Sequence, residues 1–261
     1  MNKVKVILYG VGEVGSRIAR HILEKEGIEI VGAIDMAKDK IGKDLGEVLG
    51  LRKRLGVQIS DNPDIVLSEV KPDIAVHATS SFLKQVYGQI ETCIKHGVNV
   101  VSTCEELSYP FVSDLQIAEE LDTLAKKHQV TVLGTGINPG FLMDTLAITL
   151  TGLCQKVEKI KVTRLMNAAT RRIPFQKKIG AGLTADEFKE KMEKRHITGH
   201  VGLAQSISMI ADALAWKLDG VVIDEVQPVI AMKPVSSEAI KVEKGEVAGL
   251  KQIARGIKSG R

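Results

Sequence analysis

The sequence predicts an α/β protein, with a doubly wound parallel sheet in its first half and an α+β arrangement in its second. Aliphatic segments alternate with helical segments and short loops through the first half, which is typical of such a sheet. Aromatic residues make up only 3% of the chain, so the core must rest on Val, Ile, Leu and Ala. Aliphatic runs of this kind are typical of buried parallel strands. The length of 261 residues predicts two domains, since one domain holds roughly 150.

The first half is predicted to hold five strands joined by helices. A glycine-rich turn over residues 10–15 follows the first strand, and the helix after it runs to about Glu26, where Gly27 ends it. Lys71-Pro72 precedes the third strand, and Gly97 ends a later helix. The predicted strands are residues 3–9, 28–34, 73–78, 99–103 and 130–133, and the later helices are 83–96 and 116–127. The first strand, helix and second strand form a βαβ unit, whose crossover is expected to be right-handed.

The pattern changes after residue 140, where we place the domain boundary. Thr184 and Glu187 have the spacing of a capping box that opens a helix to about Lys194. The other predicted helices are 144–152 and 201–218, and the predicted strands are 157–165, 223–232 and 239–242. Alternation along 157–165 indicates one solvated face, as in a sheet partly covered by helices. Residues 141–261 are therefore predicted to form the α+β domain.

Composition excludes several classes of protein. The net charge of +4 comes from interspersed Lys and Glu, without the basic face and stacking aromatics of nucleic-acid-binding proteins. The three cysteines lack a C-x-x-C spacing, which argues against a disulfide framework and favours a reducing compartment. Neither a signal peptide nor a membrane-spanning apolar stretch is visible. We expect a cytoplasmic protein with no nucleic-acid or membrane partner.

The glycine-rich turn and the end of the second strand predict a dinucleotide site. Gly10, Val11, Gly12, Glu13, Val14 and Gly15 match G-x-G-x-x-G between a strand and a helix, and Asp35 follows at the end of the next strand. Gly10 would permit the tight turn, Gly12 the close approach of a diphosphate, and Gly15 the packing of helix on strand. The N-terminus of the helix would supply N–H groups and a positive dipole end. Residues 1–140 are thus predicted to be a Rossmann domain that binds NAD or NADP.

Asp35 favours NAD, because a carboxylate that binds the ribose hydroxyls repels a 2′-phosphate. Lys38 and Lys40 lie near enough in sequence to soften this preference. Proteins that bind FAD or S-adenosylmethionine use similar glycine-rich loops, and they are the alternative. We favour a nicotinamide cofactor because of the loops that follow three later strands.

Small and hydroxyl residues repeat in these three loops, at strand ends where open α/β sheets bind ligands. The cofactor-binding candidates in them are Ala78, Thr79, Ser80, Thr103, Asn138 and Pro139, and Thr135 is a candidate for the substrate. Each loop alone is compatible with ordinary turn chemistry. Three at one sheet edge indicate a ligand site.

Four segments together resemble the 2,4-diaminopentanoate dehydrogenase family: the glycine-rich turn, 102–110 (Ser-Thr-Cys-Glu-Glu-Leu-Ser-Tyr-Pro), 134–140 (Gly-Thr-Gly-Ile-Asn-Pro-Gly) and 199–202 (Gly-His-Val-Gly). The resemblance covers essentially the whole chain. This family is related in fold to dihydrodipicolinate reductase and includes native amine dehydrogenases. The resemblance implies oxidative deamination of (2R,4S)-2,4-diaminopentanoate to 2-amino-4-oxopentanoate, with NAD or NADP reduced and ammonia released, as in ornithine fermentation. Members usually continue for several dozen residues, so it also implies that the second domain is C-terminally truncated.

Glu105 and Glu106 are the catalytic candidates. Amine oxidation needs a base for the ammonium proton and a group that orients water, and one carboxylate near the nicotinamide can do both. Similarity to the amine dehydrogenases implies that one of the two is the catalytic glutamate, and the sequence does not choose between them. Alternatively, both glutamates simply favour the first turn of a helix.

The second domain offers further candidates for binding the amine substrate. His200 precedes an apolar helix, where it could contact substrate or simply cap the helix. Arg171, Arg172, Lys177 and Lys178 form a basic stretch, and Arg171 is the candidate to grip a substrate carboxylate; most such charges face solvent. His196 and His200 lack a third metal ligand, so no metal is expected. We also expect this domain to mediate a homodimer.

Two other functions remain open at this point. One is an imine reductase like dihydrodipicolinate reductase, although the second domain lacks the Gly-His-His-type cluster of those enzymes. The other is a dinucleotide-binding regulator without catalysis. Turnover of an amine with release of ammonia distinguishes the dehydrogenase from both.

Overall fold

The computed structural model describes residues 3–171 and 173–258, and the chain divides into two compact units. The first unit extends to Leu146 and the second begins at Ala147. The boundary placed after residue 140 lies in the turn-rich segment that precedes this division.

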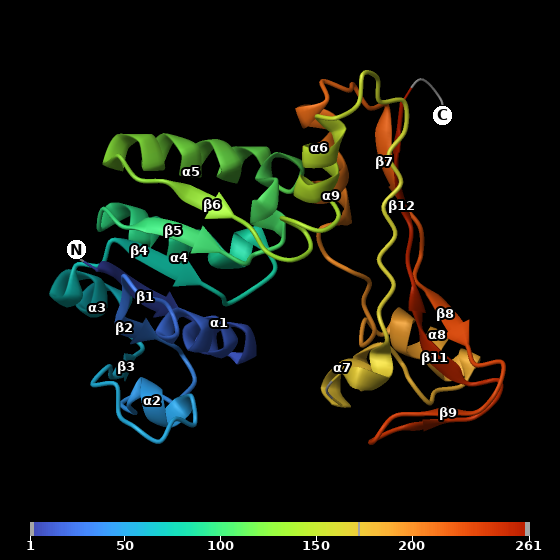
Figure 1. The fold of residues 1–261 in the computed structure, drawn as a ribbon, viewed down its shortest axis with the longest axis horizontal. Helices are drawn as coiled ribbons and strands as arrows, with labels where there is room; N and C mark the ends of the chain where they lie inside the picture. Colours follow the sequence, from blue (N-terminus) through green and yellow to red (C-terminus); the bar gives the residue numbers. More distant parts are fainter. Residues whose placement is uncertain (1–2, 172, 259–261) are drawn as a thin grey trace. The chain divides into compact units, whose positions relative to one another are not determined.

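The first unit is built on six parallel strands, in the order β3-β2-β1-β4-β5-β6 (Figure 1). The strands are β1 (Val4–Tyr9), β2 (Ile28–Ile34), β3 (Ile59–Ser60), β4 (Ile74–His77), β5 (Asn99–Ser102) and β6 (Val132–Gly134). The order reverses between β1 and β4, because β2 and β3 extend the sheet on one side of β1 and the later strands on the other. The doubly wound parallel sheet is therefore confirmed. The two-residue β3 was not predicted, since it is too short to carry a periodic pattern.

Helices cover both faces of this sheet. They are α1 (Glu13–Leu23), α2 (Leu45–Val48), α3 (Pro63–Val70), α4 (Leu83–Lys95) and α5 (Leu115–His128), with 3₁₀ turns η1 (Glu106–Ser108) and η2 (Pro110–Val112). Ile7 and Tyr9 of β1 join a buried cluster with side chains of α3, α4 and α5. Leu8, which lies between them, joins a second cluster with Ala19 of α1 and Leu45 of α2. Both faces of β1 are buried, which is why its sequence is a nearly continuous aliphatic run.

The second unit is α+β, as predicted. It contains the rest of α6 (Thr145–Thr151), η3 (Ala168–Thr170), α7 (Ile173–Lys178), α8 (Ala185–Glu193), α9 (Leu203–Ala213), β7 (Gly220–Ile223), β8 (Gln227–Ile230), β9 (Val235–Ser236), β10 (Lys241–Val242), β11 (Val247–Lys251) and β12 (Ala254–Ile257). The strands pair antiparallel as β7 with β12, β8 with β11 and β9 with β10. Thr184 and Glu187 form the predicted capping box at the start of α8.

Three predicted elements of this unit need correction. Residues 157–165 form no strand, and Leu165 is 95% exposed. Alternation supplies the period of a strand, but a strand also needs a partner ladder, and the described residues provide none here. The predicted strand 223–232 is interrupted after β7, where Asp224 accepts from Arg255 at 2.7 Å, and the chain continues as β8 with a different partner. The helix predicted over 201–218 ends early, at Ala213, and Ala215 has a φ of +51°.

The cysteines are unpaired thiols. Burial raises the pKa of Cys93 to about 12 and that of Cys104 to about 11. Both thiols are therefore protonated at neutral pH and are poor nucleophiles. No helix within the described parts of the chain is long and apolar enough to cross a membrane.

Candidate functional site

Four loops of the first unit leave the sheet at its carboxyl edge, around the point where the strand order reverses. Each loop begins with a backbone hydrogen bond that continues the ladder: Gly10 N to Ile34 O, Ala78 N to Tyr9 O, Thr103 N to His77 O, and Thr135 N to Ser102 O. These bonds place the predicted cofactor residues of the first unit at one sheet edge. Open α/β sheets bind ligands at this position.

The glycine-rich turn is shaped by close backbone contacts. Gly10 has a φ of +98°, and a Cβ on it would lie 2.4 Å from Ala78 O. A Cβ on Gly15 would lie 2.0 Å from Gly10 O. Helix α1 therefore packs against the turn too closely for any residue with a Cβ at position 15. A Cβ on Gly12, by contrast, would meet no protein atom within 4 Å.

Gly12 is also the N-cap of α1, and as a glycine it provides no side-chain cap. The flanking residues Glu13 and Val14 are exposed. The space beside Gly12, at the start of α1, is therefore open. We call the turn over residues 10–15, together with the first turn of α1, the cradle. It fits the diphosphate of a dinucleotide, since helix N-termini bind phosphate through N–H groups and the helix dipole.

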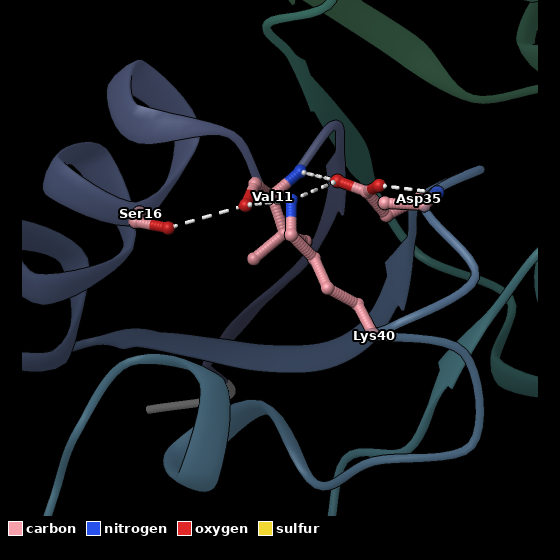
Figure 2. Close-up of polar contacts among 5 residues, drawn as sticks. Val11, Ser16, Asp35 and Lys40 are labelled. Carbon is pink, nitrogen blue, oxygen red and sulfur yellow. Dashed lines mark hydrogen bonds and ion pairs between the residues drawn. The ribbon is translucent and has the colours of Figure 1, made fainter.

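Asp35 follows β2 and binds the backbone of the same turn (Figure 2). Its Oδ2 accepts the N–H of Val11 at 2.8 Å, and its Oδ1 accepts that of Ala37 at 2.9 Å. Lys40 Nζ lies 3.2 Å from Asp35 Oδ2 and 3.0 Å from Val11 O. These bonds hold the carboxylate that is predicted to bind the adenosine ribose in place beside the cradle.

The loop after β4 carries Ala78, Thr79 and Ser80, and a buried histidine anchors it. His77 Nδ1 lies 2.8 Å from Ser102 Oγ, and Nε2 lies 2.7 Å from Gln89 Oε1 and 3.0 Å from Thr79 Oγ1. Burial lowers the pKa of His77, and the hydrogen bond that His77 Nε2 donates to Gln89 Oε1 only partly opposes this effect. His77 is therefore neutral at pH 7 and fixes Thr79 beside the cradle.

His77 should make the stability of the protein depend on pH. The unfolded chain binds a proton on this ring near pH 6.5, whereas the folded chain does so only at lower pH, so the free energy of unfolding falls as the pH drops below about 6.5. Urea unfolding at pH 7 and pH 5.5 measures this loss. We expect it to be smaller in His77→Gln and unchanged in His21→Gln, whose side chain is 79% exposed. Equal losses in all three proteins would contradict the assignment.

The two glutamates after β5 have different surroundings. Glu106 Oε2 accepts the N–H of Leu83, the first residue of α4, at 2.7 Å. Phe82, the N-cap of α4, provides no side-chain cap, so Glu106 satisfies an N–H group that the helix leaves unpaired. The Glu105 carboxylate is half-buried at the start of η1 and accepts no hydrogen bond within the described residues.

The loop after β6 packs against the loop that bears these glutamates. A Cβ on Gly134 would lie 2.2 Å from Leu107 O. Further along, the Asn138-Pro139 peptide is cis, and Pro139 is buried. Asp144, which is 0% exposed, accepts from Gly140 N at 2.9 Å and thereby closes this loop.

Some of the residues that shape this site were not predicted from the sequence. The anchoring roles of His77 and Gln89 depend on contacts between residues 10 or more positions apart, and no local motif signals them. The position of Asp144 four residues after Gly140 is the only trace of its role.

Arg171 and His200 belong to the second unit. The Arg171 guanidinium lies 5.4 Å from the centroid of the Phe175 ring. The N–H of His200 donates to Gln252 Oε1 at 2.8 Å, and the N-cap of α9 is Gly202, which provides no side-chain cap. Arg172 lies outside the described residues. The predicted substrate-binding roles of Arg171, His200 and Thr135 stay predictions.

No group of three His, Cys, Asp or Glu that could hold a metal occurs within the described ranges.

The comparisons with known proteins agree with this architecture. Residues 4–133 match the family described as dihydrodipicolinate reductase, N-terminus, and residues 141–261 match the 2,4-diaminopentanoate dehydrogenase C-terminal domain. A protein of Acetoanaerobium sticklandii named 2,4-diaminopentanoate dehydrogenase is 34% identical over 256 residues, which cover 95% of this chain and 70% of the relative.

Amine dehydrogenases are also similar. That of Streptomyces virginiae is 25% identical over 224 residues, covering 83% of this chain and 61% of the relative. The structure of an amine dehydrogenase from Mycobacterium smegmatis superposes with a TM-score of 0.76 and 30% identity, over 98% of this chain and 75% of that one.

The parallel sheet, the glycine cradle and these relatives define an NAD(P)-dependent dehydrogenase with a Rossmann-type domain. More specifically, the chain belongs to the 2,4-diaminopentanoate dehydrogenase family. The resemblance stated from the sequence is thereby confirmed.

Proposed function

We propose that this protein oxidatively deaminates a small diamino acid, 2,4-diaminopentanoate, to 2-amino-4-oxopentanoate and ammonia, with NAD(P) as the oxidant. The observation that carries the proposal is the Glu105 carboxylate. It lies in a loop at the same sheet edge as the dinucleotide cradle and accepts no hydrogen bond within the described part of the chain. The name of the relative from Acetoanaerobium sticklandii supports the substrate.

Glu105 is the proposed base. A dinucleotide held in the cradle would supply the hydride acceptor for the carbon that carries the amine. Glu105 first takes a proton from the substrate ammonium, because the nitrogen lone pair must be available to form the iminium. After releasing that proton to solvent, Glu105 removes a proton from the water that adds to the iminium. It then returns this proton to the nitrogen, so that ammonia leaves as the carbonyl forms and departs with the carbonyl proton as ammonium. Overall, one ammonium substrate, one oxidised dinucleotide and one water give the ketone, ammonium, the reduced dinucleotide and one proton.

Glu106 is proposed to hold the other loops in place. Its hydrogen bond to Leu83 N ties the loop that bears Glu105 to the start of α4. The same helix carries Gln89, which contacts both His77 and Thr79. Glu106 thus joins the catalytic loop to the loop beside the cradle, without itself touching the reacting atoms.

An absorbance assay at the NADH band tests the proposal. We expect reduction of NAD or NADP with 2,4-diaminopentanoate and release of an equal amount of ammonia, and slower reduction with simple diamines and monoamino acids. Dinucleotide binding without turnover of any amine would contradict the proposal and favour a regulator. The imine-reductase alternative is weaker, because the second half of the chain, residues 141–261, matches the 2,4-diaminopentanoate dehydrogenase C-terminal domain, whereas the dihydrodipicolinate reductase family model matches residues 4–133.

A further inference from the structure

The adenosine end of the cradle holds a lysine that the glycine motif does not require. Lys40 Nζ bridges Val11 O, at 3.0 Å, and Asp35 Oδ2, at 3.2 Å (Figure 2). The Lys40 and Asp35 side chains are only 23% and 12% exposed. This ion pair is therefore sheltered, unlike the surface pairs that solvent and salt weaken.

Asp35 remains ionised in this setting. Burial by itself raises the pKa of Asp35, but the N–H groups of Ala37 and Val11 and the Lys40 ammonium outweigh burial and hold the pKa below its ordinary value. An ionised carboxylate at this position would repel a 2′-phosphate. Lys40 places a compensating positive charge against it, so the repulsion is largely cancelled.

Both side chains keep capacity for a ligand. An ammonium has three N–H donors, and Lys40 uses two of them on Val11 and Asp35; no acceptor for the third occurs within the described residues. Among the described residues, Ala37 N is the one donor to Asp35 Oδ1, which leaves this oxygen able to accept a ribose hydroxyl. Lys38, in contrast, is exposed and bonds neither Asp35 nor Val11.

We propose that Lys40 is the specificity-determining residue that lets this site accept NADP as well as NAD. This inference rests on the proposed function, in which the cradle holds a pyridine dinucleotide. With NAD, the ribose 2′-hydroxyl donates to Asp35. With NADP, the Lys40 ammonium donates to the 2′-phosphate, while Val11 N–H and Ala37 N–H continue to hold Asp35.

Fluorescence titration with NADH and NADPH tests the assignment in Lys40→Met. Loss of one charge-assisted hydrogen bond should raise the Kd for NADPH about tenfold or more, while the Kd for NADH changes by less than about threefold. Competition with 2′,5′-ADP and 5′-ADP should show the same selectivity. Added salt should weaken NADPH binding more than NADH binding in the parent protein.

Two further variants complete the test. Lys40→Arg keeps the charge and should retain NADPH binding, and Lys38→Met is the matched control, with both Kd values unchanged. Thermal unfolding verifies that each variant is folded. Two results would overturn only the role of Lys40 and not the proposed function. One is a parent protein that binds NADH but not NADPH, and the other is an equal loss of affinity for both nucleotides in Lys40→Met. Failure of the parent to bind either nucleotide would overturn the proposed function as well.

Discussion

Glu105→Gln should lower turnover of the amine about 100- to 10,000-fold, the usual contribution of a positioned general base. Glutamine keeps the size and polarity of the side chain but cannot take a proton from the ammonium or from water. The Glu105 carboxylate accepts no hydrogen bond within the described residues, so its loss should leave the fold and the binding of NADH unchanged. Steady-state kinetics and NADH titration on the same preparation measure both quantities.

Glu106→Gln is the matched control for this experiment. Its side-chain oxygen can still accept the N–H of Leu83, so the cap on α4 survives in weakened form. We expect most of the activity to remain and the melting temperature to fall slightly. If Glu106→Gln remains folded but shows the severe loss of activity that we expect for Glu105→Gln, the roles of the two glutamates are reversed. If both variants keep full activity, neither carboxylate is the base.

Gly12→Ala should weaken dinucleotide binding while the protein folds normally. The backbone of Gly12 has a φ of −72°, which alanine adopts readily, and the added Cβ meets no protein atom within 4 Å. The methyl group would instead occupy the space in which the diphosphate approaches the first N–H groups of α1. We expect the Kd for NADH to rise about tenfold or more, which corresponds to ~1.4 kcal/mol or more of binding free energy.

Gly88→Ala is the control for the effect of a methyl group on a glycine. Gly88 lies inside α4 with open space around it, so alanine should stabilise the protein by about 0.5–1 kcal/mol and leave binding unchanged. Gly15→Ala should instead destabilise the fold, because its Cβ would meet Gly10 O at 2.0 Å. NADH binding by Gly12→Ala with the parent Kd would contradict the cradle.

The sequence was sufficient for those features that are local or periodic. The aliphatic strands of the first unit are buried on both faces, so their runs were visible, and the glycine-rich turn has a fixed spacing. The capping box at Thr184 and Glu187 depends on contacts within four residues and was found in the same way. Features built from distant segments could not be predicted. The segment 157–165 has the period of a strand, but whether it pairs depends on the rest of the chain.

The same limit applies to the site. The sequence placed Glu105 and Glu106 together as equivalent candidates, and a contact with Leu83, more than twenty residues away, separates their surroundings. Lys40 was recognised only as a nearby charge. Its bridge from Asp35 to Val11 depends on how the turn after β2 folds back onto the cradle.

The most direct test of the account is a crystal structure with NAD bound. We expect the diphosphate within hydrogen-bond distance of the first N–H groups of α1, the adenosine ribose on Asp35, and the Glu105 carboxylate facing the nicotinamide ring. A dinucleotide bound elsewhere, or a diphosphate that makes no contact with the turn at Gly12, would contradict it.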